Sequence, residues 1–268
     1  MTVSATPKNP NKSDKPILPW LDALTWVAWG AVLLKLGITG RLRLLIHPNY
    51  TVLVFGTGII FVAMGGMKCW DLYGRYRRSG RFEVEQTGQH ITLFPKGWST
   101  GLLLAAAIAG LLIPPKILGS ETALQRGVSA SLPNTQTQTQ IFRTTTKPEE
   151  RTIIDWVRAF NAYPEPDAYN GQSANVTGFA VHSPDLGENY IYICRFMITC
   201  CAVDAYPVGL IVKLPNGRAE YPPDRWLQVE GRMITETVAG KRQAVIEVAS
   251  SDNIEKVPTP RNPYEFNE

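Results

Sequence analysis

Two adjacent cysteines, Cys200 and Cys201, are the residues of this 268-residue chain whose type and spacing best suit chemistry. Asp204 follows them within the same short segment, and Cys194 precedes them. Thiolates and carboxylates are ligands for zinc and other soft metal ions in proteins. Cys200, Cys201, Asp204 and Cys194 therefore form one candidate metal site, and zinc is one soft metal that would suit it.

The same cysteines allow other interpretations. A structural disulfide from Cys194 to Cys200 or Cys201 is compatible with a compartment outside the cytoplasm. A bridge between the two neighbours is unfavourable, because bridged Cα atoms are usually about 4.4 to 6.8 Å apart and consecutive ones about 3.8 Å. Against metal binding, the two-residue spacing of common zinc motifs is missing. Buried unreactive thiols and active thiol exchange also stay open, and Cys69 is expected to be a packing residue.

The remaining polar residues point to no reaction. His47, His90 and His182 are isolated, and we expect them to be solvated or locally hydrogen-bonded, with His182 alone able to approach the cysteines. For Arg195 and Asp204 two interpretations stay open, a structural ion pair near the rim of the barrel and a functional role. We found no Ser/His/Asp set, phosphate-binding glycine loop or paired catalytic carboxylates, so we do not expect an enzyme.

The elements that must position the cysteines begin with three apolar stretches, over residues 20–38, 50–70 and 98–117. Each has about 20 mostly apolar residues, enough for a helix to cross a bilayer at about 1.5 Å per residue. We therefore expect a membrane domain over residues 20–118 after a polar tail of residues 1–19. We expect the first stretch to be retained rather than cleaved as a signal peptide, because a second follows closely.

Basic residues flank these stretches unevenly, and this predicts an orientation. Most lie before the first stretch or between the second and third, and basic loops stay in the cytoplasm. We expect a multi-pass protein of the cell membrane with a cytoplasmic N-terminus and an extracytoplasmic C-terminal domain. A re-entrant first segment would leave two spans and invert this orientation. The basic residues are Lys8, Lys12 and Lys15, then Arg41 and Arg43, then Arg75, Arg77, Arg78, Arg81 and Lys96.

The formal net charge of +4 does not indicate nucleic-acid binding. The basic cluster lies beside a membrane span, where anionic lipids and topology explain it. We therefore expect the lipid bilayer, and no nucleic acid, as a partner.

Residues 119–147 are rich in Ser, Thr, Gln and Asn, with a low-complexity run over residues 135–140. Such a segment buries too little to fold alone, so we expect a flexible linker with any order confined to its membrane-proximal part. Residues 148–268 are expected to form the extracytoplasmic domain. It begins with a short helical pattern whose apolar stripe is Ile153, Ile154, Trp156, Val157 and Phe160.

Five alternating segments with intervening turns then predict strands. Gly178 and Gly231 fall inside two of them, where glycine relieves strain at a bend. We expect a small closed OB-like barrel first and an open sandwich second. Tyr190, Tyr192 and Phe196 share one strand face, as aromatic residues do that stack ligands or pack in a core. The expected strands are residues 175–181, 190–199, 208–213, 226–234 and 242–248.

Several segments together resemble the YcgQ-like family of permease subunits. The similarity extends over about residues 150–268 and is looser over the apolar stretches. Where that family has Ala-Asp after the cysteines, this chain has Val203-Asp204, which keeps the carboxylate. The resemblance implies membrane spans, an extracytoplasmic domain and a gene beside a large predicted permease. The segments are residues 178–179, 195–205, 226–231 and 260–264.

The resemblance and the cysteines favour two functions. The first is an accessory subunit of a membrane permease, whose three helices attach to a multi-span partner and whose external barrel captures, gates or senses the transported species. The alternative is a stand-alone, membrane-anchored protein with vicinal thiols that binds a soft metal or acts in redox stress.

Overall fold

A computed structural model describes residues 17–79, 97–128 and 147–266. These fall into two compact units, Met1–Leu42 with Asn49–Pro115, and Arg43–Pro48 with Lys116–Glu268. The polar tail before residue 17, the loop that carries Arg81, His90 and Lys96, and the low-complexity run over residues 135–140 lie outside the described residues.

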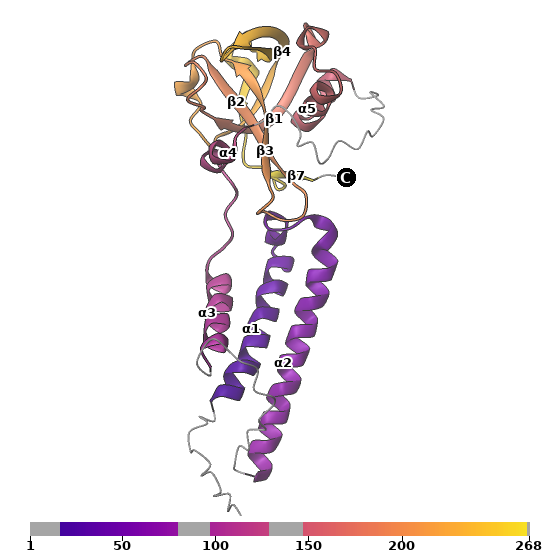
Figure 1. The fold of residues 1–268 in the computed structure, drawn as a ribbon, viewed down its shortest axis with the longest axis vertical. Helices are drawn as coiled ribbons and strands as arrows, with labels where there is room; N and C mark the ends of the chain where they lie inside the picture. Colours follow the sequence, from indigo (N-terminus) through magenta and orange to yellow (C-terminus); the bar gives the residue numbers. More distant parts are fainter. Residues whose placement is uncertain (1–16, 80–96, 129–146, 267–268) are drawn as a thin grey trace, which may run out of the picture. The chain divides into compact units, whose positions relative to one another are not determined.

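The first unit consists of α1 (Leu18–Ile38), α2 (Thr51–Ser79) and α3 (Trp98–Leu112) (Figure 1). Among the described residues, two helices are long and apolar enough to cross a membrane, Leu18–Ile38 and Pro48–Arg78. The third expected stretch is helical for only 15 residues. It ends at Leu112 because Pro114 disfavours the helical conformation in the residue before it, and Ile113 is extended. The helix therefore ends five residues before the C-terminal bound of the expected stretch.

Glycines allow α1 and α2 to pack closely. A Cβ atom on Gly30 of α1 would lie 2.6 Å from the Val62 side chain, and one on Gly65 of α2 would lie 2.6 Å from the Val27 side chain. Small residues at helix crossings allow such close approach of the two backbones.

Helix α1 also packs against α3. Ala107 is fully buried there, and Gly110 lies beside Val32. Lys35 of α1 donates a hydrogen bond from Nζ to the carbonyl of Leu111, in the last turn of α3. A lysine at this place satisfies a carbonyl that has no partner within its own helix and complements the helix dipole.

The second unit is built around a mixed β-sheet, preceded by the helices α4 (Ser120–Arg126) and α5 (Ile153–Ala162). Helix α4 lies at the beginning of the stretch expected to be a linker. All five expected strands are confirmed, with ends that differ by a few residues, and two short strands at the C-terminus add to them. The strands are β1 (Ser173–Val181), β2 (Tyr190–Ile198), β3 (Tyr206–Lys213), β4 (Trp226–Val238), β5 (Lys241–Glu247), β6 (Ile254–Lys256) and β7 (Tyr264–Phe266).

The strand pairings form a ring. The order is β1-β2-β3-β5-β4, and β4 pairs again with β1. Only the β3–β5 and β2–β7 pairs are parallel. Strand β1 pairs with β4 through its first part and with β2 from Phe179 onward.

Gly178 of β1 and Gly231 of β4 lie where these two strands change their pairing partner. A Cβ on Gly178 would lie 2.6 Å from the carbonyl oxygen of Cys194, and a Cβ on Gly231 would lie 2.6 Å from that of Glu247. Both sites therefore require glycine, because the backbone of a neighbouring strand approaches closely. This close approach is the physical reason for a glycine at each position.

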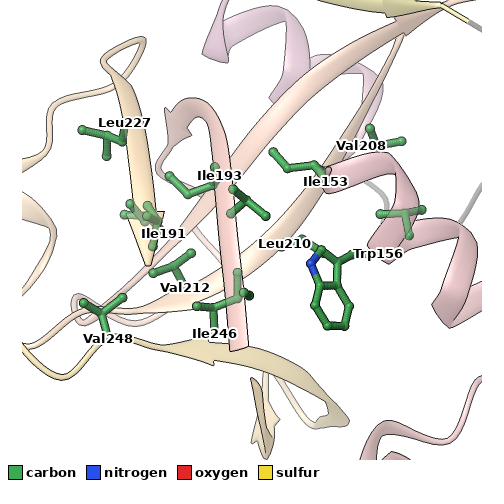
Figure 2. Packing of buried hydrophobic residues seen from close by; sticks show 14 of the residues in the cluster. Ile153, Trp156, Ile191, Ile193, Val208, Leu210, Val212, Leu227, Ile246 and Val248 are labelled. Carbon is green, nitrogen blue, oxygen red and sulfur yellow. The ribbon is translucent and has the colours of Figure 1, made fainter. Parts of the chain in front are cut away.

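Figure 2 shows the main core, in which Ile191 and Ile193 of β2, Val212 of β3 and Ile246 of β5 belong to one buried cluster with Trp156 of α5. Helix α5 begins with a capping box between Thr152 and Asp155, which satisfies free N–H groups of the first turn. The core fixes both ends of the β2–β3 connection, on which the adjacent cysteines lie.

Candidate functional site

Cys200, Cys201 and Asp204 lie in the tight connection between the end of β2 at Ile198 and the start of β3 at Tyr206. The Asp204 carboxylate turns back over this connection. It accepts hydrogen bonds from the backbone N–H of Cys200 at 2.8 Å and of Cys201 at 3.1 Å. The carboxylate therefore fixes the conformation of the two cysteines that precede it.

The two thiols and the carboxylate are close together. Cys200 Sγ lies 3.8 Å from Cys201 Sγ, and the sulfurs and a carboxylate oxygen of Asp204 all lie within 4.8 Å of one another. Cys200 is exposed and Cys201 is half-buried. Val203, at the tip of the same turn, is 85% exposed, so solvent reaches this group.

Hydrogen bonding controls the ionisation of the group. The pKa of Cys200 is raised to about 11, first by its hydrogen bond to Asp204 and then by that to Cys201. Partial burial raises the pKa of Asp204, but hydrogen bonds from the Cys200 thiol and the backbone of Cys200, Cys201 and Thr199 outweigh it and leave that pKa below its usual value. At neutral pH the site therefore holds one carboxylate and a protonated Cys200.

Cys194 does not belong to this group. It lies in the interior of β2, is fully buried and packs in a cluster with Phe179, Phe196 and Trp226. Burial raises the pKa of the Cys194 thiol far above its usual range. The structure thus brings together three of the four expected ligands. None of the four cysteines forms a disulfide. Phe196 stacks on Phe179 with 5.5 Å between ring centroids, so it is a core residue.

Arg195 and Asp204 do not form the ion pair that the sequence suggested. Arg195 pairs with Glu265 of β7, and its guanidinium lies 5.4 Å from the centre of the Trp226 ring. Arg195 has this partner because the C-terminal segment returns beside β2, with Met197 opposite Glu265.

The segment Arg43–Pro48, from between α1 and α2, completes the site from the other side. The His47 N–H donates to the carbonyl of Cys200 at 2.9 Å, and the Ala202 N–H donates to that of Leu45 at 2.8 Å. Ile46 and Cys201 face each other between these bonds as an antiparallel bridge. Nothing in the local sequence indicated this pairing.

Two of the three histidines lie in the described residues. His47 is 7% exposed, and its ring lies 5.3 Å from that of Phe266, so it is not solvated. His182 Nε2 lies 2.8 Å from the carbonyl oxygen of Tyr221 and is locally hydrogen-bonded, as expected.

Arg126, at the end of α4, also stabilises the turn that carries Cys200 and Cys201. Its guanidinium donates to the carbonyl of Ala202 at 3.4 Å and also to that of Ala205. With the Asp204 carboxylate and the Leu45–His47 backbone, it fixes the path of the chain around both cysteines. Sequence reasoning did not single out Arg126, because it lies far from the cysteines along the chain.

A polar cleft of about 890 Å³ lies in another part of this unit. Its charged lining residues include Lys213, Glu230, Arg232 and Glu247, and the described lining contains neither cysteine nor histidine. Lys213 is paired with Glu247 at 3.3 Å. The cleft therefore has no soft ligands and is distinct from the thiol group.

The sequence matches two protein-family models, one for each half of the chain. A family model described as the DUF1980 N-terminal domain matches residues 21–129, and one described as the DUF1980 C-terminal domain matches residues 137–267. No curated protein and no solved structure matches the chain.

Proposed function

The chain belongs to the DUF1980 family, and from this premise we propose that it is an accessory subunit of a membrane permease, as its resemblance to the YcgQ-like family implies. In this role the apolar helices attach to a multi-span partner in the lipid bilayer. The external domain captures, gates or senses the transported species. The subunit itself carries out no reaction and binds no nucleic acid.

The observation that carries this proposal is the pairing of the α1–α2 connection with the cysteine turn. Two backbone hydrogen bonds join Leu45 and His47 to Ala202 and Cys200. A change in the turn is therefore passed directly to the chain that links two membrane helices. A sensing or gating subunit needs such a connection, whereas a domain that acts alone on a flexible tether does not.

The same pairing supports three crossings. A segment that pairs with the β domain lies on the same side of the membrane as that domain. After α2 returns across the bilayer, one more crossing is needed before residue 116. Helix α3 provides about 22 Å, and residues 113–115 add up to about 10 Å when extended, against a hydrocarbon core of about 30 Å.

The two prolines that follow α3 make a non-helical end to this crossing less unfavourable. Pro114 and Pro115 have no backbone N–H that would be left unpaired in lipid. With the basic loops in the cytoplasm, the third crossing places the β domain outside. The protein is then a multi-pass protein with a cytoplasmic N-terminus.

The ring of strand pairings supports an OB-like barrel as the form of the external domain. An OB-type barrel has five main strands, and here β1 pairs with both β2 and β4. Gly178 and Gly231 lie where β1 and β4 change pairing partner, as expected for strands that bend around a barrel.

The proposal is tested by purification of the tagged full-length protein from native membranes in mild detergent, followed by mass spectrometry. We expect a multi-span permease in stoichiometric amount. In intact cells, a membrane-impermeant maleimide should label Cys200 without permeabilisation. A protein that purifies alone, or a Cys200 that is labelled only in permeabilised cells, would overturn the subunit role or the orientation, respectively.

A second candidate function is favoured by the grouping of Cys200, Cys201 and Asp204 within 4.8 Å. It is a stand-alone vicinal-thiol protein that binds a soft metal or acts in redox stress. The same purification separates the two, because a protein that carries thiol-bound metal and no permease supports the second.

A further inference from the structure

We propose that Cys200, Cys201 and Asp204 bind one thiophilic divalent metal ion of the zinc type through two sulfurs and one carboxylate oxygen, with one coordination position left open. The ion would be the species that the external domain captures or senses. To that extent the inference rests on the proposed function, although the binding itself requires no partner.

The spacing of the sulfurs fits a single ion. Two thiolates on one tetrahedral ion lie about 3.8 Å apart, since each metal–sulfur bond is about 2.3 Å and the bonds meet at about 109°. Cys200 Sγ and Cys201 Sγ are 3.8 Å apart. The peptide unit between adjacent cysteines is therefore no obstacle in this turn, although their sequence spacing is unlike that of common zinc motifs.

The third ligand is already oriented towards the sulfurs. A carboxylate oxygen and a sulfur on one such ion lie about 3.6 Å apart, and the Asp204 oxygen and both sulfurs lie within 4.8 Å of one another. Small side-chain rotations close the difference. The backbone N–H groups of Cys200 and Cys201 hold the carboxylate in place, as hydrogen bonds to ligands do in metal sites.

The binding step balances without an oxidant or reductant. Each thiol releases its proton to solvent as its sulfur–metal bond forms, so one ion displaces up to two protons. The Asp204 carboxylate then binds the ion in place of the Cys200 thiol hydrogen. Two thiolates and one carboxylate leave the occupied site with a net charge of −1.

The open position points to exchange rather than a structural role. Structural zinc sites are closed by four protein ligands, whereas sites with three keep a position for water or another ligand. Cys194 cannot supply a fourth ligand, because it is fully buried in the β2 core. Cys200 is exposed and Val203 beside it is 85% exposed, so an incoming or receiving group can reach the ion.

Metal binding at Cys200 and Cys201 would change the backbone pairing between their turn and the α1–α2 connection. Cys201 faces Ile46 directly, between the two backbone hydrogen bonds of His47 and Ala202. Cys201 would supply a metal ligand, and it is also one of the two residues of the β-bridge. Movement of its side chain towards an ion would therefore change the backbone pairing with Ile46.

The test uses the full-length protein in detergent, with a tag free of histidine, after reduction and removal of metal. Zn²⁺ is titrated in competition with a chromophoric chelator, and Cd²⁺ is used to detect thiolate charge-transfer absorption. We expect one ion per chain. Cys200→Ser and Cys201→Ser should each weaken binding by at least about tenfold, and the double variant should lose the Cd²⁺ band. Cys69→Ser is the matched control and should bind as the original protein does.

Asp204→Asn separates ligation from folding. It should weaken Zn²⁺ binding and keep the Cd²⁺ band, with the far-ultraviolet circular dichroism of the domain unchanged. Zn²⁺ should also change amide hydrogen exchange at residues 45–47 in the original protein and not in the double cysteine variant. Absence of binding, or equal affinity in the double variant, would overturn the site.

The outcomes also separate this inference from the proposed function. Metal binding by a protein that purifies without a permease would retain the site and reject the subunit role. A permease that co-purifies equally with the original protein and with the double cysteine variant, when neither binds metal, would reject the site and retain the subunit role.

Discussion

Cys194 and the Cys200–Cys201 pair lie on one strand and the turn that follows it, yet they occupy opposite environments. Cys194 is fully buried among Phe179 and Phe196, whereas Cys200 is exposed beside Asp204. The difference arises because β2 continues through the core until Ile198 and the turn begins immediately after it. The chemistry open to a thiol here depends on where the strand ends, and not on its distance from other cysteines along the chain.

The largest expected effect is a loss of stability from a change in the buried cluster that contains Cys194. Phe196 is fully buried and stacks on Phe179, so Phe196→Ala should lower the free energy of unfolding by about 3–5 kcal/mol. Hydrogen exchange of the β1 and β2 amides in the full-length protein would measure this. Val203→Ala, at the exposed tip of the turn, is the matched control and should leave exchange unchanged. Equal exchange in the two variants would contradict the assigned core.

Serine substitutions test the two thiol environments directly. Cys194→Ser places a hydroxyl in an apolar cluster and should cost about 1–3 kcal/mol, because an unpaired polar group is then buried. Cys200→Ser should change stability by no more than about 0.5 kcal/mol. Thermal unfolding of both variants, followed by circular dichroism, gives the comparison, and a larger loss for Cys200→Ser would reverse it.

The reactivity of Cys200 should depend on Asp204. Because the pKa of Cys200 is raised to about 11, chiefly by Asp204, its alkylation by iodoacetamide should be slow at pH 8 and should still increase with pH near 10. Asp204→Asn removes the carboxylate acceptor, lowers that pKa and should speed alkylation at pH 8 by about three- to tenfold. Tandem mass spectrometry locates the label. Unchanged rates in this variant would show that Asp204 does not hold the thiol proton.

The smallest expected effect concerns the arginine that supports the turn. Arg126→Gln removes hydrogen bonds to the carbonyls of Ala202 and Ala205 and should cost about 1 kcal/mol, as a local loosening. Amide exchange should quicken at residues 199–205 and remain the same in the β2 core. Arg225→Gln, a change at an exposed arginine, serves as control. A uniform rise in exchange over the whole domain would mean that Arg126 supports the fold rather than the turn.

Local patterns were sufficient for the strands, because alternation reports which face of a strand is buried. They were also sufficient to group Cys200, Cys201 and Asp204, since a short turn keeps these residues together. Cys194 was included with them because it is close along the chain, but its side chain lies in the buried interior of β2, which ends at Ile198.

Long-range partners could not be derived in this way. The ion pair of Arg195 with Glu265 and the contact of Arg126 with the cysteine turn join residues far apart along the chain. The pairing of Ile46 with Cys201 is the clearest case, because it joins an irregular segment to an irregular turn. Neither partner carries a periodic signal, so only the folded chain reveals it.

The inclusion of Arg43–Pro48 in the β unit makes this a discontinuous domain. During synthesis these residues emerge long before the strands that they join, so the domain cannot be complete until those strands have also been made. Closing such a long loop is slow and entropically costly. A fragment that begins at α4 would therefore fold without its first segment and would leave the backbone of Cys200 and Ala202 without these partners.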